Sequence, residues 1–334
     1  MRYVLGIDQG ASKTYAMVAD ERGGIVGFGQ SAGACHSTNG MEKAVESATA
    51  AASAALAQAG CAIEDIRHVT AGATGVDWPG EAELVARHFA SALCCPLERV
   101  QVVNDCIIAL RAGTRKDSGC VLCAGSGLNC AVVKDRRVEV IFGFYIPDED
   151  QGGAALGRRT LRAVFDAQMD LIPPTALTQE LLSYFRAQSV DELLHRYVDG
   201  GVTPQEVLYL PMLLERAATQ NDRVALDILE QYGKTLARYA VAGLRKADML
   251  DADIDVVLSG SILKCRIPVL KETVAAQIHR HAGRARIVDS YLEPVVGAVL
   301  MGLDKLYDVL PQSLYDRIEA DARQMDLVRC CASN

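Results

Sequence analysis

The sequence predicts an α/β protein of two domains, the second of which is enlarged by helices. Two apolar hairpins of the same design, residues 3–19 and 119–133, each carry small polar residues at the turn. Strands and helices alternate after each hairpin, which is typical of open α/β sheets. The chain has 334 residues, enough for two domains that each bury a core of their own.

The first hairpin is predicted to present a carboxylate and several hydrogen-bond donors at its tip. Two apolar strands, residues 3–7 and 16–19, flank a turn with these members: Asp8, Gly10, Ser12, Lys13 and Thr14. Because Gly10 has no Cβ, backbone N–H groups can approach a phosphate there. Asp8 can hold Mg²⁺ through water. An ordinary solvated turn is the alternative interpretation of the same residues.

The second hairpin repeats this plan, with Gly125, Ser126, Gly127 and Asn129 in its turn. Two such turns facing each other would hold a polyphosphate through backbone amides and hydroxyls. The chain has no GxxxxGK[ST] sequence, so a P-loop is excluded.

A third apolar strand, residues 100–105, lies between the hairpins and ends in Asn104 and Asp105. A carboxylate at the end of a strand of an open α/β sheet is a natural general base. The alternative is that Asp105 caps the helix expected from Ile107 onward.

These motifs together carry a family resemblance. Gly6–Thr14 reads GIDQGASKT against the family sequence GIDGGGTKT, and Gly125–Ala131 follows GTGSNA with Cys130 intervening. With the Asn104-Asp105 pair and a late glycine turn at Leu258–Ile262, the chain resembles the BadF/BadG/BcrA/BcrD-type ATPases, which include the N-acetylglucosamine kinases. That family belongs to the actin-like superfamily of sugar kinases, Hsp70 and actin, and the resemblance runs from Tyr3 to about Leu306.

The resemblance implies two actin-like (ribonuclease H-like) domains with a nucleotide cleft between them. It also implies an ATP-dependent kinase that uses ATP and Mg²⁺ to phosphorylate a hydroxyl of a sugar or amino sugar. In this interpretation Asp105 is the catalytic base, Asp8 organises the metal, and Gly260 and Ser261 border the nucleoside. We expect an N-terminal domain over residues 1–114, a C-terminal domain with a helical insertion over 115–310, and a C-terminal helix and tail over 311–334.

The resemblance also places four segments near the acceptor sugar. Residues 31–40 form a loop where related kinases contact substrate, and its candidates are His36 and Asn39. Thr74 and Gly75 follow a strand at residues 68–71, and Asn104 precedes the base. The acidic stretch of Asp148, Glu149 and Asp150 matches a family sequence whose Asp binds the sugar, with a register uncertain by one residue. The structural alternatives are plain loop polarity for residues 31–40, an ordinary βα turn for Thr74 and Gly75, and a helix N-terminal charge for the acidic stretch.

The remaining elements follow in order along the chain. We expect a strand near residues 25–30, an alanine-rich helix at 41–59, a helix at 81–93, a strand at 137–144 and almost continuous helix from 160 to 246. Thr203 and Glu206 form a capping box before an apolar periodicity. A strand at residues 255–259, a helix at 268–282, a strand at 285–288 and a helix from Glu293 complete the domain.

Composition restricts the partners. The net charge of −8 argues against nucleic acid or an anionic membrane as the main partner, because either needs a basic surface. No apolar run reaches the ~20 residues of a membrane span, and no signal segment opens the sequence, so a cytoplasmic protein is expected. The 11 cysteines lie mostly in apolar runs and are expected to be reduced core residues; this includes Cys120 and Cys123. The apolar stripe along residues 222–246 is either core or a dimer face. The long helical section of the second domain carries more apolar surface than one sheet face can cover, which predicts a homodimer.

Two other functions fit the same motifs. One is an ATPase that activates a dehydratase, as some members of the resembling family do, which would need exposed cysteines to hold an iron–sulfur cluster across a dimer. The other is a degenerate kinase that only binds nucleotide or sugar, because Gln9, Ala11 and Leu128 replace the family's Gly, Gly and Ser.

Overall fold

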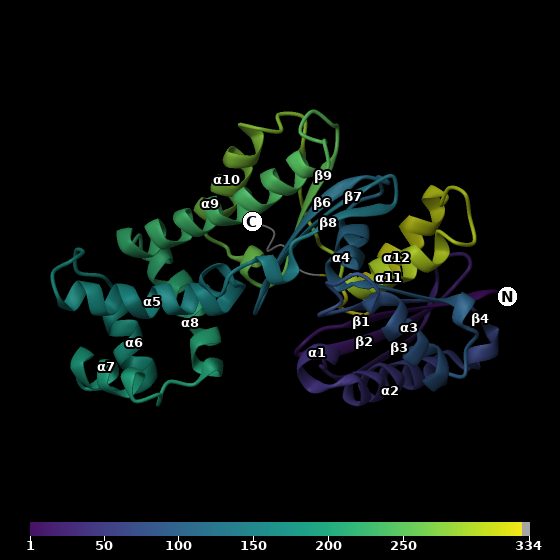
Figure 1. The fold of residues 1–334 in the computed structure, drawn as a ribbon, viewed down its shortest axis with the longest axis horizontal. Coiled ribbons are helices and arrows are strands. Elements are labelled where there is room, and N and C mark those ends of the chain that lie inside the picture. Colours follow the sequence, from purple (N-terminus) through teal and green to yellow (C-terminus); the bar gives the residue numbers. More distant parts are fainter. Residues whose placement is uncertain (329–334) are drawn as a thin grey trace. The chain divides into compact units, whose positions relative to one another are not determined.

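The structure is a computed structural model that describes residues 1–328. The chain divides into two compact units: the first contains residues 1–121, 133–138 and the chain from 288 onward, and the second contains residues 122–132 and 139–287. Two five-stranded sheets form the framework (Figure 1).

The sheet of the first unit has the strand order β3-β2-β1-β4-β5. Its strands are β1 (Tyr3–Gln9), β2 (Lys13–Asp20), β3 (Ile25–Ala32), β4 (Ile66–Ala73) and β5 (Val100–Asn104). β2 runs antiparallel to β1 and β3, whereas β1, β4 and β5 are parallel. The carboxyl ends of β1, β4 and β5 therefore share one edge of the sheet, where ligands of open α/β sheets bind.

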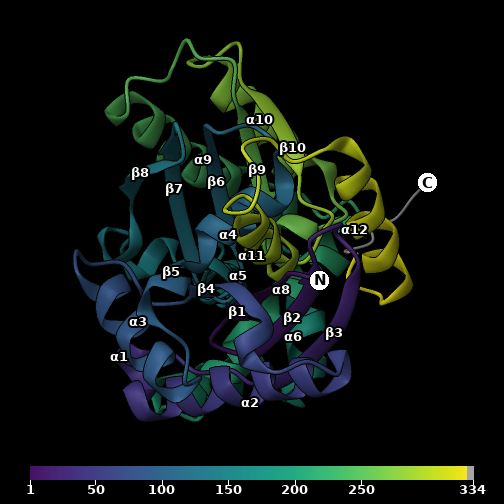
Figure 2. The ribbon, with the colours of Figure 1, turned by 90° about the vertical axis from the view of Figure 1, so that its right-hand side faces the viewer.

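Helices cover both faces of this sheet. The helices of the first unit are α1 (His36–Asn39), α2 (Met41–Ala59), α3 (Glu81–Ala92), α4 (Asp105–Gly113), α11 (Pro294–Leu303) and α12 (Gln312–Gln324). α2 packs on β2 and β3 and α3 on β5, while α4 and α11 contact each other and β4 on the opposite face. Figure 2 shows α4 beside α11 and α2 across the sheet from them.

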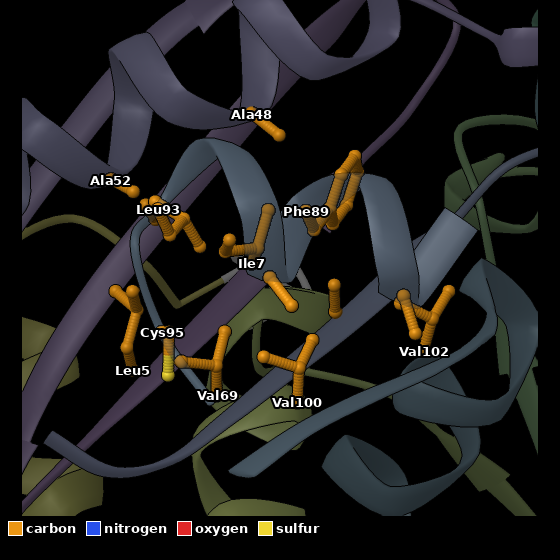
Figure 3. Packing of buried hydrophobic residues seen from close by; sticks show 14 of the residues in the cluster. Leu5, Ile7, Ala48, Ala52, Val69, Phe89, Leu93, Cys95, Val100 and Val102 are labelled. Carbon is orange, nitrogen blue, oxygen red and sulfur yellow. The ribbon is translucent and has the colours of Figure 1, made fainter. Parts of the chain in front are cut away.

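The core under α2 and α3 consists of closely packed apolar side chains. Leu5, Ile7 and Phe89 are fully buried there, and Figure 3 shows them facing Ala48 of α2. Burial of a side chain of this size contributes about 1.5–3 kcal/mol. The alanines of α2 let its backbone approach β3, where a Cβ on Gly29 would collide with the helix backbone. The alanine-rich sequence is thus a packing requirement of this face.

The second sheet has the order β10-β9-β6-β7-β8. Its strands are β6 (Gly119–Ala124), β7 (Leu128–Lys134), β8 (Arg137–Ile141), β9 (Asp255–Ser259) and β10 (Arg286–Asp289). In chain order, the first strand is central, the next two extend one side and the last two extend the other, as in the first sheet. The duplicated plan suggested by the two hairpins is therefore present in the topology.

The second unit carries the helical enlargement. Its helices are α5 (Gly152–Gln168), α6 (Leu177–Phe185), α7 (Val190–Val198), α8 (Pro204–Thr219), α9 (Arg223–Lys246) and α10 (Pro268–His279). The predicted capping box starts α8: the Thr203 hydroxyl accepts a hydrogen bond from the Glu206 N–H, and the Glu206 carboxylate accepts one from the Thr203 N–H.

Several boundaries differ from the sequence prediction. Residues 115–121 and 133–138, assigned to the second domain, group with the first unit. Residues 288–310, assigned to the second domain, group with the first unit, because α11 lies against β1: a Cβ on Gly6 would meet the Val299 backbone N at 2.7 Å. The first turn is also shorter than predicted, since β2 begins at Lys13. The predicted C-terminal helix is present as α12, and the last six residues of the predicted tail lie outside the described residues.

Candidate active site

The shared edge of the first sheet brings several predicted site residues together. β4 and β5 pair in parallel with Ala73 opposite Asn104, so Thr74 and Asp105 follow the two strands at the same level. Asp8 lies near the end of β1, opposite Gly72 of β4. Asp8, Thr74 and Asp105 therefore come from three neighbouring strand ends.

Asp105 is the first residue of α4, and Asn104 is its N-cap. The Thr74 hydroxyl and the Cys106 N–H hydrogen bond the Asp105 carboxylate, and the Asp77 carboxylate lies close to it. Burial, followed by repulsion from Asp77, raises the pKa of Asp105 from 3.8 to about 6. A carboxylate whose pKa approaches neutrality is suited to accept a proton from a hydroxyl.

Asn104 is buried, with 2% exposure, and its whole side-chain amide is used within the protein. Its Nδ2 donates to the Val76 carbonyl at 3.2 Å and to the Asp77 carboxylate at 3.0 Å, and its Oδ1 accepts from the Cys106 N–H. In this structure Asn104 caps α4 and holds Asp77 beside Asp105, a role that the sequence analysis missed for both residues. That Asn104 also contacts the substrate stays a prediction.

The loop at residues 35–39 packs on the turn after β4. Gly75 has φ +81°, and a Cβ there would meet the Cys35 Sγ at 2.6 Å; Cys35 also hydrogen bonds the Thr74 carbonyl. The His36 Nε2 is buried without a hydrogen-bond partner in the described chain and lies 3.5 Å from Glu81 Oε1. The structure thus groups His36, Thr74 and Gly75 as the sequence predicts.

Asn39 and Glu81 shape this region from within. The Asn39 Oδ1 accepts the Cys35 N–H at 2.9 Å, which closes the α1 turn, so this oxygen has a structural use. Glu81 Oε2 accepts the N–H groups of Asp77 and Trp78 and fixes the start of α3. Trp78 is 51% exposed and adjoins this acidic edge.

The first predicted phosphate turn is formed by residues 10–12, closed by a hydrogen bond from the Gly10 N–H to the Lys13 carbonyl. Ser12 is exposed at its tip. The Lys13 ammonium lies 3.5 Å from the Glu293 carboxylate and 4.0 Å from the centre of the Tyr15 ring, so it is directed along β2.

Thr14 lies outside the turn and has structural contacts, and its assignment to ATP stays a prediction. It lies in β2 with no exposed surface. Its hydroxyl donates to the Ala32 carbonyl and hydrogen bonds Ser47 of α2. Its polar side chain joins the sheet to α2, a use that a polar turn motif does not distinguish from phosphate binding.

The second predicted phosphate turn is braced by the start of α5. The Gly125 N–H donates to the Gly127 carbonyl, and the Gly125 carbonyl accepts the Gly153 N–H at 2.7 Å. The Gln151 side chain accepts the Leu128 N–H and donates to the Ile146 carbonyl. Ser126 and Gly127 remain exposed. The hydrogen bonds therefore fix the base of the turn and leave the two residues at its tip accessible.

Gly260 and Ser261 adjoin this second turn. Gly260 has φ +98°, and a Cβ there would collide with the backbone of Ala124. The Ser261 Oγ lies 4.0 Å from the position that a Cβ on Gly125 would occupy. Only glycine combines this φ with such close approach.

Asp150 has a structural role in the second unit, and its assignment to the substrate stays a prediction. It is 7% exposed. Its carboxylate accepts hydrogen bonds from Arg238 at 2.6 Å, from the Tyr239 hydroxyl at 2.7 Å and from Arg159 at 3.2 Å. Two guanidinium groups and a hydroxyl therefore occupy the carboxylate oxygens.

Asp148 and Glu149, the other members of the acidic stretch, have exposed side chains. Their backbone carbonyls accept hydrogen bonds from Arg158 and Arg159, respectively. If the stretch contacts a sugar, these two carboxylates are the ones available to do so.

Two of the three replacements that suggested a degenerate kinase, Gln9 and Leu128, have structural roles. Gln9 is buried and donates to the Ala44 carbonyl at 2.6 Å, which ties β1 to α2. Leu128 is buried, and its N–H is held by Gln151. Neither side chain enters the turn that it borders.

A resident metal would rely on few protein ligands. Within residues 1–328 no three His, Cys, Asp or Glu side chains gather closely enough to hold a metal ion. The single carboxylate of Asp8 at a strand end fits Mg²⁺, which keeps several water ligands and needs only one or two carboxylates. No helix of the described chain is long and apolar enough to cross a membrane.

Comparison with known proteins gives evidence of the family that does not depend on the geometry of the site. A family model described as the BadF/BadG/BcrA/BcrD ATPase family matches residues 5–302. An N-acetylmuramic acid/N-acetylglucosamine kinase of Clostridium acetobutylicum is 22% identical over 305 residues, covering 90% of this chain and 98% of the relative. A glucosamine kinase of Vibrio cholerae is 24% identical over 245 residues, covering 72% of this chain and 80% of the relative.

Solved structures agree on the fold. A protein of Chromobacterium violaceum, studied as a candidate N-acetylglucosamine kinase, superposes with a TM-score of 0.66 at 20% identity, covering 90% of this chain and 99% of the other. A ROK family glucokinase of Streptomyces griseus in complex with glucose and AMPPNP gives a TM-score of 0.58 at 20% identity, covering 92% and 99%. These similarities establish the two-domain sugar-kinase fold.

Proposed function

Because the chain belongs to the BadF/BadG/BcrA/BcrD ATPase family, we propose that it is an ATP-dependent kinase that phosphorylates a hydroxyl of a sugar or amino sugar. The observation that carries this proposal is the Asp105 site at the joint edge of β4 and β5. There a carboxylate with a pKa near 6 receives a hydrogen bond from Thr74 and is positioned by the Asn104 cap. The curated relatives named as amino-sugar kinases support the choice of acceptor.

The proposed reaction moves one phosphoryl group and one proton. The acceptor hydroxyl attacks the γ-phosphorus of ATP, its proton passes to Asp105, and the bond between the γ-phosphorus and the bridging oxygen breaks to release ADP. Phosphoryl transfer needs chiefly positioning and neutralisation of charge. Asp105 supplies the proton acceptor, and Thr74 orients its carboxylate.

Each unit, taken by itself, carries a hairpin turn with groups that can bind phosphate. Backbone N–H groups near Gly10 and Gly127, with the Ser12 and Ser126 hydroxyls, are donors suited to phosphate oxygens. Gly260 and Ser261 adjoin the second turn and would border the nucleoside. Asp8 would hold Mg²⁺ through water, and a bound Mg²⁺ neutralises charge on the phosphates.

The acceptor would lie against the edge of the first sheet. His36, Thr74 and Gly75 place polar atoms along this edge. We infer that these groups of the first unit contribute to recognition of sugar hydroxyls. Asp148 and Glu149 of the second unit have exposed side chains, and their contact with a sugar stays a prediction from the family resemblance. N-acetylglucosamine and glucosamine are the first acceptors to test, because relatives named for them match most of the chain.

A kinase assay with purified protein tests the proposal. ATP, Mg²⁺ and a panel of N-acetylglucosamine, glucosamine, N-acetylmuramic acid and glucose should give ADP and a sugar phosphate with at least one acceptor. Asp8→Ala should abolish Mg²⁺-dependent turnover while the circular dichroism spectrum and melting temperature stay close to those of the parent. Full turnover in Asp8→Ala would show that Asp8 is not needed to hold the Mg²⁺ ion. A protein that none of these sugars and no nucleotide stabilises against heat would contradict the kinase function itself.

The activator alternative makes a different prediction. A cluster shared across a dimer requires accessible cysteines from each subunit, and within residues 1–328 Cys94 is the exposed one, whereas Cys61, Cys123 and Cys265 are partly covered. Purified protein should therefore be colourless. A brown protein that contains iron and sulfide would favour the activator over the kinase.

We also propose that the protein forms a homodimer in the cytoplasm, where ATP is available. The helices of the second unit expose Tyr209 at 40% and Met212 at 56% on α8, an apolar surface that a second copy could cover. Multi-angle light scattering at micromolar concentration should report twice the chain mass of 35.9 kDa. A monomer at that concentration would refute the dimer without affecting the kinase proposal.

A further inference from the structure

A cavity of about 170 Å³ lies within the first unit, away from the candidate base. It is enclosed by β5, the outer side of α4, the C-terminal end of α11 and the segment 133–138. Its apolar lining consists of Val103, Ile107, Leu110, Val133, Val138 and Met301. A cavity of about 150 Å³ with apolar walls holds a benzene molecule, so the apolar part of an occupant is limited to about one six-membered ring.

The rim of this cavity is charged, with an excess of cations. Four cationic side chains and two carboxylates line it: Arg111, Lys116, Arg136, Lys305, Asp117 and Asp304. Both arginines are paired: Arg111 binds Asp304 through two nitrogens at 2.8 and 3.1 Å, and Arg136 binds Asp117 at 2.7 Å. These two pairs neutralise both carboxylates of the lining, so neither carboxylate balances the charge of Lys305.

Lys305 is the cation best placed to receive an anion. Its side chain makes no ion pair with any of residues 1–328, whereas its neighbour Asp304 is fully engaged with Arg111. Lys305 also lines a second, adjoining cavity with His68 and Arg99. Burial, followed by the charges of Lys305 and Arg99, lowers the pKa of His68. A bound anion would relieve this concentration of positive charge.

A second observation at the same place points to a ligand. The Gln101 side chain lines both cavities, and its Oε1 is buried without a hydrogen-bond partner in the described chain. A buried polar atom left unpaired costs about 1–3 kcal/mol, and a ligand that hydrogen bonds the amide recovers this cost. Rotation of the amide by 180° would present its NH₂ group to an anion.

We propose that this cavity is a binding site for a small amphipathic anion, a carboxylate or phosphate monoester whose apolar part is about the size of one ring. The apolar part fills the space between β5 and α4, and the anionic group lies at the rim near Lys305 and Gln101. Such a ligand contacts the outer side of α4, the helix whose first residue is Asp105. The site is distinct from the strand-end edge, and its existence does not depend on the identity of the phosphorylated sugar.

Phenyl phosphate, benzyl alcohol and inorganic phosphate are the probes that test this site in the full-length protein. Ligand-observed NMR titration should give saturable binding of phenyl phosphate with a Kd on the order of 1 mM or tighter. Benzyl alcohol has the ring without the anion, and inorganic phosphate has the anion without the ring. Both should bind at least about tenfold more weakly, because each lacks one of the two recognised parts.

Variants locate the binding. Lys305→Glu reverses the rim charge and should weaken phenyl phosphate binding about tenfold, and Val138→Phe, at a half-exposed lining position, should abolish it by filling the cavity. Lys43→Glu makes the same charge change on exposed α2 and should bind as the parent does. Absent binding, equal affinity for the three probes, or equal weakening by Lys43→Glu and Lys305→Glu would overturn the proposal. Because the titration needs no turnover, its result is separate from the success of the kinase assay.

Discussion

Asp105 follows the end of a strand, and Asp150 belongs to an acidic stretch. Both residues carry a carboxylate, but the groups around the two carboxylates differ in charge. Asp150 is surrounded by Arg238, Arg159 and the Tyr239 hydroxyl, which satisfy and neutralise its charge. Asp105 receives hydrogen bonds from the Thr74 hydroxyl and the Cys106 N–H and faces a second carboxylate, and its pKa rises to about 6. One environment suits a structural residue, and the other suits a group that takes up a proton.

The comparison shows that chemistry is assigned by the partners of a side chain and not by its motif. Arg238 and Tyr239 reach Asp150 from α9, more than 80 residues further along the chain. Asp77 reaches Asp105 because Asn104 holds its loop. Both sets of partners are brought into place by the tertiary fold.

The largest expected effect is on turnover at Asp105. Asp105→Asn keeps the size and the hydrogen-bond acceptor of the side chain but removes the proton acceptor, so kcat should fall by roughly 10² to 10⁴. The helix should be unaffected, because Asn104 and not Asp105 caps α4. Nucleotide affinity, measured by calorimetry, should remain within about twofold of the parent. Phosphorylation at the parental rate would show that Asp105 is not the base.

Much of the fold could be predicted because its signals are local. The two hairpins, the alanine-rich α2 and the capping box of α8 each depend on residues close in sequence, and all are present. The position of α11 could not be predicted, because it depends on the close approach of its backbone to Gly6 and Ile108, almost 300 and 190 residues away. Contacts at such separation leave no periodic pattern in the chain.

The site was predictable in position but not in the roles of its members. The family resemblance placed His36, Thr74, Gly75 and Asp105 in one region, and the parallel pairing of β4 with β5 brings Thr74 and Asp105 together. The resemblance did not show that the polar atoms of Thr14 and Asn104 are used by backbone and neighbouring side chains. Asp77 was missed because a polar residue in a βα turn has no distinguishing sequence signal.

The next effect concerns stability at Asp150. Asp150→Asn removes the charge that Arg238 and Tyr239 share and should lower the free energy of unfolding by about 1–2 kcal/mol. The loss is limited because the Arg238 side chain is 65% exposed and can turn to water. Denaturation by urea, monitored by circular dichroism, measures the change.

Asp227→Asn is the matched control for Asp150. Asp227 pairs with Arg223 on the same helix as Arg238, and both side chains are largely exposed, so this change should alter stability by less than about 0.5 kcal/mol. Equal losses in the two variants would mean that Asp150 is an ordinary surface ion pair.

The third effect is on the pH dependence of the reaction. If Asp105 must be ionised, kcat/KM should rise with pH through a midpoint near 6. Asp77→Asn removes the like charge that raises the pKa, so the midpoint should move to lower pH. It should stay above the ordinary 3.8, because burial is the larger cause. An unchanged midpoint in Asp77→Asn would show that Asp77 does not act on the base.

The smallest expected effect is on the stability of Asp105→Asn. This substitution and Asp150→Asn should change the free energy of unfolding in opposite directions. A carboxyl whose pKa is raised on folding is less easily ionised in the folded protein than in the unfolded chain, so ionisation destabilises the fold as pH rises from 3.8 toward 6, and the full cost is present above 6. Replacing Asp105 with a neutral amide removes this cost, and Asp105→Asn should be more stable than the parent at pH 8 by on the order of 1 kcal/mol. Below pH 3.8 the Asp105 carboxyl is protonated in both the folded and the unfolded parent protein. The stability advantage of Asp105→Asn should therefore disappear. Urea denaturation at pH 8 and pH 3.5 measures the difference; a variant that is less stable than the parent at pH 8 would show that the Asp105 charge is as well compensated as that of Asp150.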